Sequence, residues 1–241
     1  MNTGIGDAFD IGWKLAAVLN GYGGKELLNS YEVERRPVGA KNMEQSGIHA
    51  SVHNQYAVWT AERGASVSLS DGEQGKLLRA KIAELVLSND GENTSHGIEM
   101  DYRFPESPVI IQDHESSENM AWHPRHYTPS TVPGSRAPHV FLRDGKTSIF
   151  DLYGKGFTIV DFTLEGTSSS RFMEAAVRLG IPLVRAHLPN ESHVRTVWKC
   201  DVGLIRPDGF VSWRGQGQGA IKALAEQQIE KTLQIATGQE L

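Results

Sequence analysis

Apolar residues follow a helical spacing through most of the first 88 residues of this chain, and after these residues short apolar runs alternate with predicted helices. This pattern restricts the fold to the α/β class with a helical N-terminal part. Apolar residues recur every three or four positions over residues 6–20, and Gly21 stands where a helix ends. Three further stretches have helical spacing: residues 25–36, 38–63 and 73–88. Pro37 is expected to end or kink the first of these.

The second half of the chain predicts a small mixed sheet. A short strand is expected over residues 108–112, followed by a proline-rich connecting segment. From Pro138 onward the order β, β, β, α, β, β, β, α is predicted, with strands at residues 140–142, 147–152, 157–162, 183–186, 202–205 and 210–213 and helices at 171–179 and 219–236. We therefore predict three parts: residues 1–112, which are mostly helical, a connecting segment at 113–137, and an α/β domain at 138–241.

Composition removes several classes of protein. No run of about 18 apolar residues occurs and no signal peptide is recognisable, so we expect a cytoplasmic protein without a membrane partner. The formal charge is −5 with basic residues dispersed, which argues against nucleic acid as a partner. The single cysteine, Cys200, allows neither an internal disulfide nor a CxxC pair, and a buried structural role is favoured over a nucleophile.

The N-terminus is the most informative stretch. A glycine-bearing turn leads into the first helix, and such a junction presents backbone N–H groups at the positive end of a helix dipole, which suits an anion or a polarised carbonyl. Asn2, Thr3 or Asp7 could equally cap the helix. From these residues alone an ordinary capped helix is the favoured interpretation.

The wider pattern resembles the FAD-dependent aromatic hydroxylases of the phenol hydroxylase type. Two blocks carry the resemblance in the family's order and at its separation: Asn2-Thr3-Gly4-x-x-Asp7-Ala8-x-x-Ile11-x-Trp13-Lys14-Leu15-Ala16 and Leu27-Leu28-x-Ser30-Tyr31-x-x-Glu34-Arg35-Arg36-Pro37. The resemblance implies FAD as cofactor, NAD(P)H as reductant, O₂ as oxidant and an aromatic small molecule as substrate. It assigns cofactor binding to Met1, Asn2, Thr3 and Gly4, whose backbone N–H groups would meet the pyrimidine side of the flavin. Reduced flavin carries negative charge there, which a helix N-terminus stabilises.

The C-terminal half resembles the thioredoxin-like domain of the same enzymes. Its motifs are Tyr127-x-Pro129-Ser130-x-x-Pro133-Gly134-x-Arg136-Ala137-Pro138-His139, Ser148-x-x-Asp151-Leu152-x-Gly154-x-Gly156-Phe157 and Arg206-Pro207-Asp208-Gly209-x-x-x-Trp213-Arg214. In this branch the domain lacks catalytic cysteines and serves packing or dimer contacts. The resemblance implies a helical C-terminal remnant of an FAD-binding domain followed by a thioredoxin-like α/β domain with a mixed sheet.

The departures from the family matter as much as the match. An opening strand, a GxGxxG turn and a helix that hold the ADP pyrophosphate are absent, as is the substrate-binding sheet. We expect either a fragment of a full monooxygenase, in which no catalytic residue can be assigned, or a noncatalytic thioredoxin-like interaction or homodimerisation module derived from one. A first helix without its parent sheet would expose Ile11, Trp13 and Leu15.

Other polar residues favour structural roles. His49 and His53 lie four residues apart on a predicted helix, as in a two-histidine metal face, but no third ligand accompanies them and no metal site is expected. Glu34, Arg35 and Arg36 could reach a cofactor or substrate, yet charges near a helix end favour local ion pairs. A polar loop site at His123 and His126 is weighed against solvated loop residues, which are favoured, and Trp198 and Trp213 are expected in a core or interface.

Overall fold

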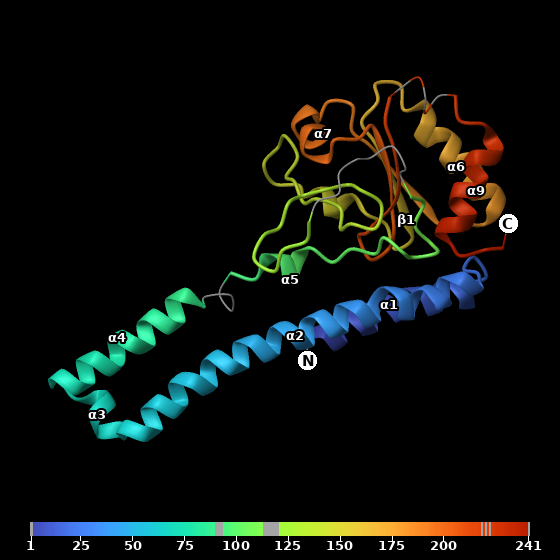
Figure 1. The fold of residues 1–241 in the computed structure, drawn as a ribbon. Coiled ribbons are helices and arrows are strands. Elements are labelled where there is room, and N and C mark those ends of the chain that lie inside the picture. Colours follow the sequence, from blue (N-terminus) through green and yellow to red (C-terminus); the bar gives the residue numbers. More distant parts are fainter. Residues whose placement is uncertain are drawn as a thin grey trace. The chain divides into compact units, whose positions relative to one another are not determined.

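The computed structural model describes residues 2–89, 94–112, 121–217, 219, 221 and 223–240, which form two compact units (Figure 1). The first, here called the sheet unit, comprises Met1–Pro37, Asp101–Ala121 and Thr128–Leu241. The second, the helical unit, comprises Val38–Met100 and Trp122–Tyr127. Among the described residues, no helix is both long enough and apolar enough to cross a membrane.

A four-stranded mixed sheet forms the centre of the sheet unit, in the order β2-β1-β3-β4. The strands are β1 (Phe157–Asp161), β2 (Leu183–His187), β3 (Val202–Ile205) and β4 (Val211–Gly215). β1 pairs parallel with β2 and antiparallel with β3, and β3 pairs antiparallel with β4. Helix α6 (Thr167–Leu179) joins β1 to β2, α7 (Ser192–Trp198) joins β2 to β3, and α9 (Glu226–Ala236) follows β4. This βαβ unit followed by an antiparallel hairpin and a helix is the expected thioredoxin-like topology.

Alternation along the strands gives the sheet two apolar faces. On one face Ile159 and Leu204 pack with Phe172 of α6 and Leu233 of α9. The two helices lie together beside the sheet (Figure 1). Arg178 of α6 pairs with Glu226 and Glu230 of α9. The opposite face buries a second cluster: Val160, Phe162, Ile205, Val211 and Trp198 of α7. The sheet is therefore the middle of three layers.

The first helices belong to the sheet unit. Helix α1 (Asn2–Leu19) turns at Gly21, whose φ of +81° suits glycine, and α2 (Lys25–Arg63) begins after it. The turn is joined to the C-terminal end of the unit, because the Gly24 N–H donates to the Thr237 carbonyl over 2.8 Å. A Cβ at Gly24 would lie 2.1 Å from the carbonyl oxygen of Gly238, so only glycine fits there.

The helical unit contains the rest of α2 with α3 (Ala65–Leu69), α4 (Glu73–Ser88) and α5 (His96–Met100). The Arg79 guanidinium donates to the carbonyls of Ser68 and Ser70, each over 2.8 Å, and thereby joins α4 to the C-terminal end of α3. The Lys41 ammonium lies 3.7 Å from the centre of the Trp122 ring, a cation–π contact within the same unit.

Several local predictions were wrong. Pro37 does not end a helix, because α2 continues through it to Arg63; the alternative, a kink at Pro37, stays a prediction. The strand expected over 108–112 is instead a turn that buries Val109 and Ile110. The hairpin expected at 140–152 forms but is shorter than predicted: Phe141 and Ser148 bridge, with backbone hydrogen bonds from Leu142 to Thr147 and from Ile149 to Val140. Its second arm then continues as a 3₁₀ helix over Ile149–Leu152 that Ser148 and Asp151 cap. Helix α7 was not expected.

Candidate functional site

The N-terminus of α1 is the site expected to contact a flavin. The helix begins at Asn2, so Asn2, Thr3 and Gly4 form its first turn rather than a loop before a helix at residue 6. Met1 lies outside the described residues. No acidic side chain of this turn offsets the positive end of the helix dipole. Asn2 and Gly4 are exposed, and a Cβ at Gly4 would meet no atom within 4 Å.

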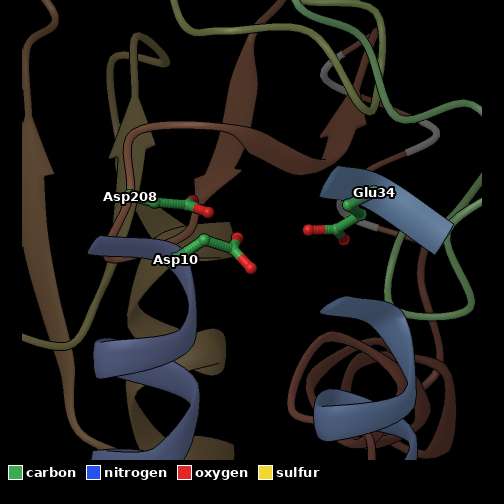
Figure 2. A group of neighbouring side chains, drawn as sticks. All are labelled: Asp10, Glu34 and Asp208. Carbon is green, nitrogen blue, oxygen red and sulfur yellow. The ribbon is translucent and has the colours of Figure 1, made fainter. Parts of the chain in front are cut away.

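A buried ion network lies further along the same helix. Asp10 comes from α1, Glu34 from α2 and Asp208 from the turn between β3 and β4, and their carboxylates point toward a shared space (Figure 2). Arg206, fully buried, spans this space. Its Nη1 lies 2.6 Å from Glu34 Oε1 and its Nη2 2.8 Å from Glu34 Oε2, a two-pronged contact that fixes both groups. Its Nε donates to Asp208 Oδ1 over 3.0 Å.

Lys14 is the second cation of the network. Its Nζ lies 2.8 Å from Asp10 Oδ2 and 2.8 Å from Glu34 Oε2, and the residue is completely buried. Ser107 adds a hydroxyl that donates to Glu34 Oε1 over 2.5 Å. Three carboxylates thus face two cations, which leaves one negative charge in excess when all are ionised.

The pKa values follow from this imbalance. Burial alone would raise the pKa of Glu34, but the charges and hydrogen bonds of Arg206 and Lys14 outweigh it and lower the pKa to about 2. At Asp10 burial dominates, helped by repulsion from the other two carboxylates, and the pKa rises to about 6 despite Lys14. Asp10 is therefore the carboxylate that binds a proton first, and this proton cancels the one excess negative charge of the network.

Aromatic rings enclose the Arg206 guanidinium. Its central carbon lies 5.2 Å from the centre of the Trp13 ring, 5.6 Å from Phe104 and 5.8 Å from Phe210. The Trp13 indole N–H donates to Asp208 Oδ2 over 3.1 Å, and its ring meets Phe157 of β1 edge-on. Helix α1 is thus joined to the thioredoxin-like domain by both ionic and apolar contacts.

The three carboxylates also have the composition of a metal site, since ligand oxygens of Asp10, Glu34 and Asp208 lie within 4.8 Å of one another. The ammonium of Lys14 and the guanidinium of Arg206 already lie between these oxygens, at hydrogen-bonding distances. A divalent cation would have to displace both. The geometry is that of an ion-pair network that ties α1 and α2 to the β3–β4 turn.

The sequence predicted the helix period of α1 but not its buried face. Asp10, Lys14 and Ala17, at positions i, i+4 and i+7, are buried, whereas the apolar residues Leu15 and Leu19 of the predicted face are exposed. Of the three side chains expected to be exposed, Leu15 is exposed, whereas Ile11 and Trp13 are half-buried and Trp13 packs against the sheet core. The recurrence of two opposite charges at i and i+4 is the signal that could have revealed the network, once paired with Glu34.

The charged residues of α2 differ in their roles. Local ion pairing was expected and is confirmed for Arg36, which pairs with Glu32 on the same helix over 3.0 Å. The expectation of a local ion pair was wrong for Glu34, which joins the buried network. It was also wrong for Arg35, whose Nε donates to Asp7 of α1 over 2.8 Å. A Cβ at Gly6 would lie 2.9 Å from Arg35 Nη2, so this glycine admits the guanidinium.

The remaining candidates have structural positions. His53 hydrogen-bonds to Tyr56, and neither His49 nor His53 belongs to a cluster of three metal-ligating side chains within the part of the chain that the structure describes. The rings of His123 and His126 stack, with centres 4.5 Å apart. Cys200 is buried, and burial raises the pKa of its thiol to about 11, which favours the structural role expected for it. Trp198 lies in the core cluster on one face of the sheet, and Trp213 packs against the cluster on the opposite face, so both have core positions as expected.

Comparison with known proteins agrees with both halves of the chain. Residues 1–46 match the FAD binding domain family, and residues 130–239 match the family described as aromatic-ring hydroxylase, C-terminal. The FAD-dependent monooxygenase apdD of Emericella nidulans is 43% identical over 223 residues, which cover 89% of this chain and 35% of that protein. The phenol 2-monooxygenase of a Pseudomonas species is 31% identical, over 91% of this chain and 40% of that protein.

Solved structures show the same relationship. The rebeccamycin biosynthetic enzyme RebC with reduced flavin matches the whole chain with a TM-score of 0.74 and 31% identity, over 42% of its own length. The chain thus spans between 35% and 42% of the relatives named here. The chain belongs to the FAD-dependent aromatic hydroxylases, of which it carries part of the FAD-binding domain together with the C-terminal domain.

Proposed function

We propose that this chain supplies the flavin-contacting helix and the C-terminal domain of an FAD-dependent monooxygenase that hydroxylates a phenol-like aromatic compound with NAD(P)H and O₂. The observation that carries the proposal is the 43% identity to a monooxygenase across both matched parts. Some relatives are named for aromatic substrates, among them phenol and 2,4-dichlorophenol. The identity of the aromatic substrate of this chain is left open.

The first turn of α1 fits the pyrimidine edge of a flavin. Its backbone N–H groups at Asn2, Thr3 and Gly4, and by the family resemblance that of Met1, would hold the edge where a reduced flavin is negative. The chemistry that bound FAD supplies is the transfer of two electrons from NAD(P)H to O₂, so that one oxygen atom enters the ring and the other leaves as water. The described residues provide orientation and charge stabilisation, and none is assigned as an acid or base toward the substrate.

The ion network behind this turn supports the same role. Asp10 lies two helical turns from Asn2, and Arg206 and Lys14 join it to Glu34 and Asp208. A rigid attachment of α1 to the thioredoxin-like domain keeps the first turn at a fixed position, which preorganised donors require. We propose that the network positions the helix rather than reacting.

The ADP end of FAD has no counterpart in the chain, which contains no GxGxxG sequence. We therefore propose that FAD is retained only when an FAD-binding portion like that of the longer relatives accompanies the chain. The division into residues 1–112, 113–137 and 138–241 is the domain organisation we propose, and residues 113–120 of the connecting segment lie outside the described residues. The cytoplasmic location stays a prediction.

The alternative function is a noncatalytic interaction or homodimerisation module. The exposed apolar side chains of α1 favour it, because they offer a surface for another protein. The two proposals differ in one respect: only the first requires that the chain complete a flavin enzyme.

A chimera tests the proposed function. The chain is joined behind the portion of the Emericella nidulans relative that lies outside the matched region, and phenol-dependent NAD(P)H oxidation is measured with mass spectrometry of the product. We expect a flavin-containing chimera that adds one oxygen atom to a phenol.

A matched pair of variants tests the role of the first turn. Proline at a first-turn position removes one N–H without breaking the helix, so Gly4→Pro should lower the flavin midpoint potential, whereas Gly4→Ala, which keeps the N–H, should not. A chimera that binds FAD and has the same potential in both variants would contradict the assignment of this turn. A folded, flavin-loaded chimera without hydroxylation of any phenol tested would favour the noncatalytic alternative.

A further inference from the structure

The helical unit contains a short segment, residues 122–127, that joins it from a later part of the chain and is here called the strap. Residues 123–126 of the strap form a turn, in which the His126 N–H donates to the His123 carbonyl over 3.4 Å. Pro124 occupies the second position of this turn, where its fixed φ is favoured. The first and fourth residues of such a turn lie side by side, which brings the imidazoles of His123 and His126 together.

The strap closes on α5 through one carbonyl. The Pro124 oxygen accepts the backbone N–H groups of Gly97 and Ile98, over 3.0 and 3.2 Å. A Cβ at Gly97 would lie 1.8 Å from the His123 carbonyl oxygen, so only glycine permits this approach. Closure of the strap on α5 therefore depends on the conformation of the turn.

The turn needs a neutral His123. Its Nδ1 accepts the Arg125 backbone N–H over 3.1 Å, and a protonated imidazole has no acceptor nitrogen. Its ring also stacks on that of His126, with ring centres 4.5 Å apart and planes at 28°. Two protonated imidazoles at this separation repel each other. A proton on His123 thus removes a hydrogen bond of the turn, and protonation of both rings adds repulsion.

Solvent protons can reach both rings, because His123 and His126 are exposed. Histidine ordinarily changes its charge between about pH 5 and 8. The described basic or titratable groups that adjoin the strap are Lys41 and His49 of α2, His96 of α5 and Arg125 of the turn. The Glu99 carboxylate of α5 already accepts the Ser95 hydroxyl over 3.1 Å. The described surroundings therefore oppose a further positive charge on His123.

The strap also forms part of the wall of a cavity. Pro124 and Arg125 line a cavity of about 210 Å³ together with Ile48, His49 and Val52 of α2. When the turn leaves α5, the cavity loses the part of its wall that the strap provides and opens further to solvent.

We propose that the strap is a pH-operated device, which is closed on α5 while His123 is neutral and opens when His123 takes up a proton. The closed strap is stable at neutral pH and is lost on acidification. No flavin, and no residue outside the helical unit, takes part in this switch.

Amide exchange of the full 241-residue chain tests the switch. Protection factors, which are corrected for the intrinsic pH dependence of exchange, are measured by NMR at pH 7.5 and pH 5.5. For Gly97 and Ile98, whose N–H groups donate to the strap carbonyl, we expect a fall by about fivefold or more at pH 5.5, the size expected for the loss of one hydrogen bond. The protection factors of Ile159 and Val160 in the central strand β1 should not fall.

Two substitutions distinguish the switch from a general loosening of the unit. In His123→Asn the side-chain oxygen can accept the Arg125 N–H but cannot take up a proton, so Gly97 and Ile98 should have the same protection at both pH values. The matched control is His53→Asn, which removes an exposed imidazole of the same unit outside the strap and should leave the fall unchanged. Circular dichroism verifies the fold of each variant.

A second measurement needs no variant. Long-range ¹H–¹⁵N correlation spectra show which ring nitrogen carries the proton. At pH 7.5 we expect the His123 proton on Nε2, because Nδ1 accepts a hydrogen bond. Protonation of Nδ1 should occur over the same pH range as the loss of protection at Gly97.

Three results would overturn the proposal: a proton on Nδ1 of His123 at pH 7.5, equal protection of Gly97 and Ile98 at both pH values in the unmodified chain, or the same fall in His123→Asn. Abolition of the fall by His53→Asn would likewise assign the titration to another imidazole and contradict the role of His123.

Discussion

Replacing Arg206 with methionine removes the cation that joins α1 and α2 to the thioredoxin-like domain. The variant leaves Glu34 without its two-pronged partner, and three buried carboxylates share the single ammonium of Lys14. Breaking a buried ion pair on one side costs about 3–5 kcal/mol, against a typical domain stability of about 5–15 kcal/mol. We expect Arg206→Met to lose unfolding free energy in that range at pH 7.5.

The assay is urea unfolding followed by tryptophan fluorescence, because Trp13 contacts the guanidinium. Arg178→Met is the matched control: this arginine is 43% exposed and pairs with Glu226 and Glu230 on the surface, so its loss should cost no more than about 1 kcal/mol.

The pH dependence gives the sharper test. The folded pKa of Glu34, about 2, lies below its ordinary 4.5, so its ionisation contributes stability that is present above pH 4.5 and is lost as the pH falls through 2. In Arg206→Met the Glu34 carboxylate loses that stabilisation and protonates at higher pH. The deficit of the variant should therefore shrink on acidification from pH 7.5 to pH 3.5. If Arg206→Met lowers the free energy of unfolding by less than about 1 kcal/mol, or by the same amount at both pH values, the role of Arg206 as the buried partner of Glu34 is refuted.

Three further outcomes are expected. The folded pKa of Asp10, about 6, exceeds its ordinary 3.8, so protonation of Asp10 contributes roughly 3 kcal/mol to the free energy of unfolding below pH 3.8. This contribution is lost as the pH rises through 6. Asp10→Asn should therefore flatten this part of the stability–pH curve, and an unchanged slope would contradict the raised pKa. Gly24→Ala should lower the melting temperature, because its Cβ would meet the Gly238 carbonyl at 2.1 Å, and an unchanged melting temperature would show that the turn is not closed there. Cys200 should react with iodoacetamide at pH 8 at least tenfold more slowly in the folded chain than in urea, since its pKa is about 11 and its side chain is buried; equal rates would show that the site is open.

Much of the sheet could be predicted from the sequence because its signals are local. Residues 157–162 form an apolar run that needs burial on both faces, and β1 occupies most of it. The turn at Pro207-Asp208-Gly209 follows from its residue types, and Gly209 has a φ of +82° as such a turn requires. Helix α6 ends at Gly180 with a φ of +67°, again a local effect of glycine.

The parts that could not be predicted depend on contacts distant in sequence. Residues 108–112 have the composition of a strand, but Ile111 contributes one hydrogen bond to Ser212 beside β4 rather than a full ladder. The partners of Glu34 lie 20 and 172 positions away, so no local rule places them. The burial of Asp10 and Lys14 reverses the face that hydropathy assigns to α1, because paired charges satisfy one another where single charges could not.

The visible spectrum of desalted protein after incubation with FAD tests the central claim most directly. The claim is that the chain contributes one edge of a flavin site and that an FAD-binding portion must supply the rest. We predict no retained flavin for the 241-residue chain alone and about one FAD per chain for the chimera with the FAD-binding portion of a relative. Stoichiometric flavin on the chain alone, or none on a folded chimera, would contradict it.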